Sequence, residues 1–143
     1  MILVDVSVLL HAYEPRSAHH ETCRSWVERA FSGEEPVCLA WVTILAFLRI
    51  ITNPAVFEAP LSAPEATDVV ASWLAQPAVF VLEAGERRWE LLRALLVESG
   101  TSGAHVTHAF LAALALENGA TLVTTDRDFA RFPKLQLDDP TAA

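Results

Sequence analysis

Short apolar runs alternate along the chain with longer segments in which apolar residues recur at helical spacing. The short runs predict buried strands at 2–4, 37–39, 79–82 and 121–124, with a candidate fifth strand at 135–137. The longer segments predict helices at 6–13, 19–31, 41–52, 63–76, 86–99 and 107–118, and one helical turn within 126–132. Strands that alternate with helices are typical of a parallel sheet covered on both faces. We therefore predict an α/β fold in three layers, with a central parallel sheet of four to five strands.

Capping residues mark several of the predicted helix ends. Ser62 is predicted to cap the helix that begins at Ala63, and Thr107 to cap the helix before the fourth strand. Gly119 is predicted to end that last helix. The chain has no internal repeat, low-complexity segment or linker, so residues 1–143 are expected to form one domain.

Acidic residues stand at the ends of the first and fourth predicted strands. Asp5 directly follows the first strand, and Asp126 lies two residues beyond Thr124. In parallel sheets function collects at the carboxyl ends of the strands, so both carboxylates should meet at one edge if these strands are neighbours. Asp128 is close enough in sequence to reach the same place. His108 opens a helix that starts from this edge, because that helix leads into the fourth strand.

Carboxylates that lie together need a compensating charge. Two of them about 4 Å apart repel by about 4 kcal/mol at an effective dielectric of about 20, and a bound divalent cation reverses the sign of that term. Mg²⁺ or Mn²⁺ takes such oxygen ligands, and metal ions can stabilise both the attacking and the leaving oxygen of a phosphodiester. An aspartate at a strand end also often caps the following helix. Capping and metal binding are therefore both open interpretations of Asp5, Asp126 and Asp128.

The acidic charge balance narrows the range of partners. A formal net charge of −8 argues against charge-driven binding of duplex DNA, but it leaves room for a nuclease whose carboxylates hold cations that bind phosphate. No segment is long and apolar enough to predict a membrane span, and the first residues lack the basic region of a signal peptide. We therefore expect a cytoplasmic protein. Cys23 and Cys38 have no zinc-ligand spacing and are interpreted as buried apolar residues.

Four stretches of the sequence together resemble one known family. They are 1–10, 47–54, 112–115 and 119–129, the last followed by Phe132-Pro133. In order and spacing they resemble the VapC toxins of the PIN-domain family over nearly the whole chain. The resemblance implies a PIN-like α/β/α domain and a Mg²⁺- or Mn²⁺-dependent endoribonuclease that cleaves RNA. It also implies a homodimer that acts as the toxin of a type II toxin–antitoxin pair and is inhibited by a VapB-like antitoxin.

Two positions of the family's acidic site do not carry acids in this chain. The family pattern Thr-x-x-Glu-x-x-Arg falls on residues 43–49, where Ala46 replaces the glutamate. The helix before the fourth strand usually opens with an aspartate, and His108 stands at that position. Asp5 and Asp126 are the predicted catalytic residues, and Asp5, His108, Asp126 and Asp128 are the predicted metal ligands. A histidine ligand would favour Mn²⁺ or a later transition metal over Mg²⁺; the alternative is a polar residue at a helix start in a weakened site.

Three further residues are predicted to contact the substrate. Arg127 and Arg131 flank the acidic residues and are the best placed to bind phosphate. Ser7 lies just past Asp5, where its hydroxyl either orients a water molecule or bonds locally to the helix backbone. His105 can approach the same cleft. Residues interpreted as surface, structural or interface side chains are His11, His19, His20 and Arg49.

Two other classes of function compete with an active ribonuclease. The missing acids leave open, as the alternative, a degenerate PIN domain that binds antitoxin or RNA with little or no cleavage, and activity with added Mn²⁺ separates these two hypotheses. A phosphatase of the haloacid-dehalogenase type needs Asp-x-Asp after the first strand, but Ser7 occupies the second position. The chain has neither a Gly-x-Gly-x-x-Gly nor a Gly-Lys-Ser/Thr loop, so no nucleotide cofactor is predicted.

Overall fold

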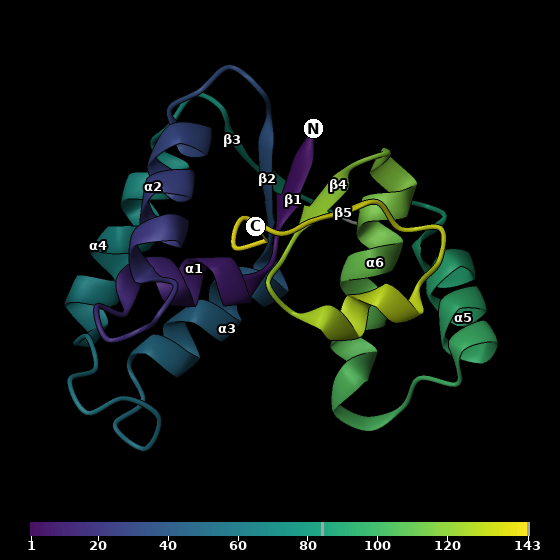
Figure 1. The fold of residues 1–143 in the computed structure, drawn as a ribbon. Helices are drawn as coiled ribbons and strands as arrows, with labels where there is room; N and C mark the ends of the chain where they lie inside the picture. The colour runs from purple at the N-terminus through teal and green to yellow at the C-terminus, as the bar shows by residue number, and fades with distance from the viewer. Residues whose placement is uncertain (84, 143) are drawn as a thin grey trace.

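The computed structural model describes residues 1–83 and 85–142, and a parallel sheet in the order β3-β2-β1-β4-β5 lies at its centre (Figure 1). The sheet is formed by β1 (Ile2–Val4), β2 (Val37–Ala40), β3 (Val79–Leu82), β4 (Thr121–Val123) and β5 (Leu137–Asp138). All neighbouring strands are parallel. The predicted α/β fold with a five-stranded parallel sheet is confirmed.

Helices cover both faces of the sheet, which gives the three predicted layers (Figure 1). One face packs against α1 (Val6–Tyr13), α2 (His20–Phe31), α3 (Trp41–Ile51) and α4 (Ala63–Leu74). The other face packs against α5 (Arg88–Ser99), α6 (Val106–Asn118) and the short 3₁₀ helix η2 (Arg127–Arg131). Successive side chains of β1 point to opposite faces of the sheet. Val4 packs in the core beneath α1 to α4, and Leu3 packs in the core beneath α5, α6 and η2.

Aromatic packing fixes α1, α3 and α4 relative to one another. Phe47 of α3 is fully buried, and its ring centroid lies 4.7 Å from that of Trp73 in α4. Trp73 donates its indole N–H to the Tyr13 hydroxyl over 2.9 Å, so the buried polar edge of the ring is satisfied. This packing holds α1 in place, and the first residue of α1 directly follows Asp5.

The order in which the strands are added to the sheet reverses between β1 and β4. The chain passes from β1 to β2 and β3 on one side, and then returns to β4 and β5 on the other. Val4 pairs with Val123, so the residues that follow these two strands emerge side by side at the carboxyl edge. A reversal of strand order of this kind leaves a crevice at the strand ends, which is where ligands bind in open α/β sheets.

Some predicted element ends were right and others were wrong. The Ser62 cap is confirmed as a capping box with Glu65, and the hydrogen bonds with Ser62 lower the pKa of the Glu65 carboxyl. The Thr107 cap is wrong: α6 begins at Val106 after the 3₁₀ helix η1 (Gly103–His105), and no side chain caps it. The fifth strand lies at Leu137–Asp138 because Leu135 is buried in the second core. Helix α5 begins at Arg88, two residues later than predicted.

Two further expectations from the sequence concern the cysteines and the membrane. Cys23 and Cys38 are free and buried, as predicted, and burial raises the pKa of the Cys23 thiol to about 11 and raises that of Cys38. Within residues 1–83 and 85–142, no helix has the length and apolar character needed to cross a membrane.

Candidate active site

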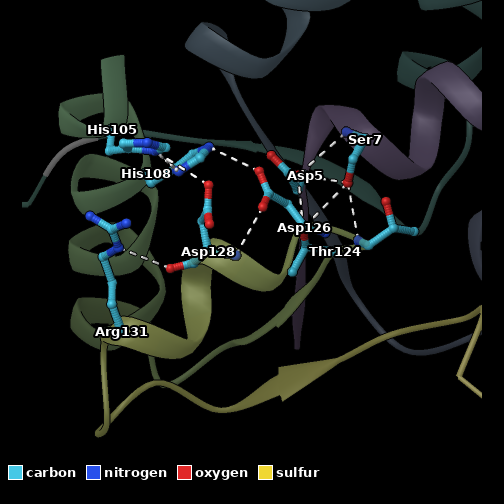
Figure 2. Close-up of polar contacts among 9 residues, drawn as sticks. Asp5, Ser7, His105, His108, Thr124, Asp126, Asp128 and Arg131 are labelled. Carbon is cyan, nitrogen blue, oxygen red and sulfur yellow. Dashed lines mark hydrogen bonds and ion pairs between the residues drawn. The ribbon is translucent and has the colours of Figure 1, made fainter. Parts of the chain in front are cut away.

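Asp5 lies at the carboxyl end of β1 and is held by two hydroxyl groups (Figure 2). Its Oδ2 accepts hydrogen bonds from the Ser7 hydroxyl over 2.7 Å and from the Thr124 hydroxyl over 2.8 Å. The backbone N–H of Ser7 also donates to this oxygen, so Asp5 caps α1. The carboxylate is only 4% exposed, and across the described residues no ion pair reaches it. The site therefore contains a buried carboxylate without a cationic partner.

Thr124 links Asp5 to Asp126 through a single oxygen. Its hydroxyl donates to Asp5, and the same oxygen accepts the backbone N–H of Asp126 over 3.0 Å. The Ser7 oxygen plays a similar part, because it accepts the backbone N–H of Thr125 over 3.1 Å. These bonds fix the turn after β4 against the start of α1. The prediction that Asp5 and Asp126 follow neighbouring strands at one edge of the sheet is confirmed.

Asp126 has one carboxylate oxygen in a cap and the other beside a histidine (Figure 2). Oδ1 accepts the backbone N–H of Asp128 over 2.9 Å, so Asp126 caps η2. Oδ2 lies 3.3 Å from Nε2 of His108. The capping interpretation thus holds for both Asp5 and Asp126. Each carboxylate keeps a second oxygen outside its cap, so capping does not exclude metal binding.

A cavity of about 190 Å³ lies against Asp5 and His108, lined mainly by α3 and α6. Thr43, Ala46 and Arg49 of α3 line its wall, so the position that carries glutamate in the family pattern does face this space. The Thr43 side-chain oxygen is buried, and it has no hydrogen-bond partner in the part of the chain that is described. A buried polar atom without a partner at the cavity wall is a place where a ligand or its water can bond.

The side chains that lie next to His108 and Asp128 are those of His105 and Asp126. The Nδ1 atom of His108 faces Nδ1 of His105 at 3.2 Å, and the Asp128 carboxylate lies 3.6 Å from His105. Asp128 therefore turns toward the start of α6, while Asp126 faces His108. The ring of His105 lies beside that of His108, but His105 is not among the residues that line the cavity.

The two arginines differ in how they are held. Arg131 donates from Nε to the backbone oxygen of Asp128 over 3.2 Å and from Nη1 to the Thr101 hydroxyl over 3.3 Å. These bonds hold η2 against the segment before α6, which is a structural role. Arg127 is exposed beside Asp126 and Asp128. Contact of either arginine with RNA stays a prediction, as does contact of Ser7.

Sequence reasoning missed the parts played by Thr43 and Thr124. Both are buried threonines, 2% and 4% exposed; Thr43 lines the cavity, and the Thr124 hydroxyl donates to Asp5. The signal that could have revealed Thr124 is its place as the last residue before the Thr125-Asp126 turn. Thr43 stands at the first position of the family pattern, but the sequence alone does not show that its hydroxyl lacks a partner.

Comparison with known proteins places the chain in a family. The family model described as the PIN domain matches residues 2–135. Ribonuclease VapC37 from Mycobacterium tuberculosis is 39% identical over 142 residues, which cover 99% of this chain and 99% of the relative. The structure of VapBC2 from Rickettsia felis bound to a promoter DNA fragment has a TM-score of 0.70 at 15% identity, covering 97% of this chain and 98% of that one. A toxin–antitoxin complex from Klebsiella pneumoniae has a TM-score of 0.66 at 15% identity, covering 100% of each chain.

The family model spans nearly the whole sequence, and the relative matches from end to end. The structural similarities, at low identity, show the shared fold. The chain therefore belongs to the PIN-domain family, in the branch of the VapC ribonucleases.

Proposed function

We propose that this protein is a divalent-metal-dependent endoribonuclease and the toxin of a type II toxin–antitoxin pair. The observation that carries the proposal is the buried Asp5 carboxylate, linked through Thr124 to Asp126 at the point where the strand order reverses. A relative with end-to-end similarity is named a ribonuclease, which supports RNA as the substrate. Residues 1–143 are proposed to act as one domain.

The residues at the site fit a hard divalent cation. Asp5 and Asp126 offer carboxylate oxygens, which Mg²⁺ and Mn²⁺ prefer, and His108 adds a nitrogen that favours Mn²⁺. Thr43 also lines the cavity, and its buried side-chain oxygen has no hydrogen-bond partner among the described residues. We propose that Asp5, Asp126 and His108 hold the ion, with Asp128 as the remaining candidate from the sequence. When bound, such an ion supplies Lewis-acid polarisation of the phosphodiester and activates a water molecule.

The chain's own residues orient this site and bind the substrate. Ser7 and Thr124 donate to one oxygen of Asp5, which fixes the direction of its carboxylate. Their own oxygens accept the N–H groups of Thr125 and Asp126, so the turn cannot shift without breaking both bonds. Ser7 and Thr124 are therefore positioning residues. Arg127 is proposed to bind substrate phosphate, and Arg131 to hold η2 while it does so.

Metal-dependent cleavage is the expected result of the decisive experiment. The antitoxin-free protein should cleave a pool of structured RNAs with Mg²⁺ or Mn²⁺, lose activity in EDTA and recover when metal is added back. Asp126→Ala, purified in parallel, exposes contaminating nuclease, and Asp68→Ala in α4 is the matched control because Asp68 is exposed on a distant helix. Cleavage confined to the native chain and the Asp68 variant supports the proposal.

The same experiment tests a second candidate function. Ala46 and His108 replace two usual acids, which favours a degenerate domain that binds antitoxin or RNA without cutting. Equal traces of cleavage in the native protein and Asp126→Ala, or no cleavage with any metal, would establish this alternative.

We also propose a VapB-like antitoxin as the partner, with a basic side chain placed among the acidic residues. The acidic body of the protein favours such a contact, and so does the buried Asp5, which has no ion-pair partner in the part of the chain that the structure describes. Removing one member of a buried charge pair weakens binding strongly. Asp5→Ala should therefore lower affinity for the antitoxin by about 10-fold or more, measured by calorimetry on folded protein. Unchanged affinity would contradict a contact at this site.

A homodimer and a cytoplasmic location complete the proposal. Large apolar side chains are exposed on α3 and α5, with Leu45 60% and Trp89 68% accessible. Exposed apolar surface of this kind favours an interface between copies of the chain. Light scattering on the purified protein should give twice the 15.6 kDa mass of one chain, and the mass of one chain would contradict the dimer. Two buried free thiols fit a reducing compartment.

A further inference from the structure

Two histidines and an aspartate form a cluster beside the acidic site (Figure 2). His105 and His108 stand three residues apart at the start of α6, so their rings lie on the same side of the helix. Asp128 comes from η2, which follows β4 in the sequence, whereas both histidines precede β4. One ligand atom from each of the three residues lies within 4.8 Å of the other two. The cluster thus unites residues from two elements that are separate in sequence.

The distances within this cluster match the edges of a metal-coordination tetrahedron. Zinc–nitrogen bonds of about 2.0–2.1 Å place neighbouring ligand atoms about 3.3 Å apart in tetrahedral geometry. The two Nδ1 atoms are 3.2 Å apart, and Nδ1 of His105 is 3.6 Å from Oδ2 of Asp128. Three side chains therefore already stand near the positions of three ligands, and a fourth position remains for water.

The second nitrogen of His108 supports the same assignment. Its Nε2 lies 3.3 Å from Oδ2 of Asp126, within ion-pair distance of that carboxylate. A histidine that binds metal through one ring nitrogen commonly donates the other N–H to a carboxylate, which fixes the ring and its tautomer. Arg131 supports the third ligand, because its Nε donates to the backbone oxygen of Asp128.

We propose that His105, His108 and Asp128 form a binding site for Zn²⁺ or a similar late transition-metal ion, which adjoins the acidic Mg²⁺ or Mn²⁺ site and shares His108 with it. The ligands are Nδ1 of each histidine and the Asp128 carboxylate, and Asp126 orients His108. His105 and Asp128 are 40% and 49% exposed, so an ion can enter from solvent. Two nitrogens and one oxygen suit Zn²⁺ better than Mg²⁺.

The two sites compete for His108. A neutral imidazole has one nitrogen lone pair, so His108 serves either the zinc site through Nδ1 or the acidic site through Nε2. Zinc binding also places an N–H of His108 against Asp126. Zn²⁺ should therefore oppose Mn²⁺-supported cleavage. This consequence rests on the proposed function, but zinc binding itself does not.

Direct binding is the test of the site. Metal-stripped protein is titrated with Zn²⁺ by calorimetry, and Co²⁺ absorbance reports the coordination geometry. We expect one Zn²⁺ per chain and a tetrahedral cobalt spectrum. His105→Ala should weaken zinc binding by about 10-fold or more. His19→Ala is the matched control, because His19 is exposed and lies outside the cluster.

Each outcome decides the proposal. Loss of binding in His105→Ala but not in His19→Ala supports the site. Zinc binding that His105→Ala leaves unchanged and Asp5→Asn removes would overturn it, since the ion would then occupy the acidic site. Absence of zinc binding in the native protein would overturn it as well. If the protein cleaves RNA, His105→Ala should retain Mn²⁺ activity and lose inhibition by Zn²⁺. An inactive protein that still binds zinc would refute the nuclease and leave the zinc site standing.

Discussion

Replacing Asp5 with asparagine should reduce metal-dependent RNA cleavage by about 100-fold or more while the chain stays folded. The substitution removes the charge that a divalent cation needs but keeps the size of the side chain. The hydroxyls of Ser7 and Thr124 can rotate to accept from the new amide, so their hydrogen bonds can be rebuilt. Asp5 is buried without an ion-pair partner among the described residues, and loss of its desolvated charge offsets part of the lost cap.

Single-turnover cleavage rates and thermal unfolding together measure this prediction. Asp68→Asn is the matched control, because it makes the same chemical change at an exposed position of α4. We expect the Asp5 variant to lose cleavage and to lose the stabilisation that added Mg²⁺ or Mn²⁺ gives the native protein. A variant that unfolds at the same temperature and cleaves at the native rate would remove Asp5 from the active site.

The fold follows from the sequence because its periodic patterns are strong. Four short apolar runs became strands, and the two residues of β1 that face opposite layers, Leu3 and Val4, are both fully buried. A strand buried on both faces is continuously apolar, which is easy to recognise. The fifth strand, which had the weakest apolar pattern, was predicted least accurately. It lies closer to the C-terminus than predicted, because Leu135 packs in the core and the exposed residues Leu137 and Asp138 form the strand.

The edge of the sheet that carries the site follows from topology, whereas its inner contacts do not. Asp5 and Asp126 each follow a strand, so parallel pairing of β1 and β4 is enough to bring them together. The direction of Asp128 depends on how η2 packs against α6, which no local pattern encodes. The sequence likewise suggested that Thr107 would cap α6, but η1 extends the helical path and places His105 at the start of α6.

The family pattern and the structure together predict that a substitution at Ala46 increases RNA cleavage. Ala46→Glu should raise the rate of RNA cleavage at limiting Mg²⁺ by about 10-fold or more, because it adds a carboxylate to the ligands that hold the ion. Ala46 lines the same cavity as Asp5 and His108, so the new side chain should enter the space beside these two proposed ligands. The cavity of about 190 Å³ leaves space for it. Thr43 lines the same cavity, and its buried side-chain oxygen has no hydrogen-bond partner among the described residues.

The added acid should also change stability in a metal-dependent way. Without metal, a further carboxylate near Asp5 should destabilise the fold by on the order of 1 kcal/mol through repulsion. Added Mg²⁺ should reverse this loss, because tighter binding to the folded state raises the unfolding temperature. Thermal unfolding with and without Mg²⁺ therefore reports on the third acid independently of RNA cleavage.

Two variants separate the charge of the new side chain from its size and from its place. Ala46→Gln fills the cavity without adding charge, and Leu45→Glu adds the charge at the neighbouring position, which is 60% exposed and does not line the cavity. Only Ala46→Glu should tighten Mg²⁺ binding and raise cleavage. If Ala46→Glu and Ala46→Gln behave alike, the site does not use a third acid here. Asp5, Asp126 and His108 would then be the complete ligand set, and the absence of the glutamate would not weaken the nuclease.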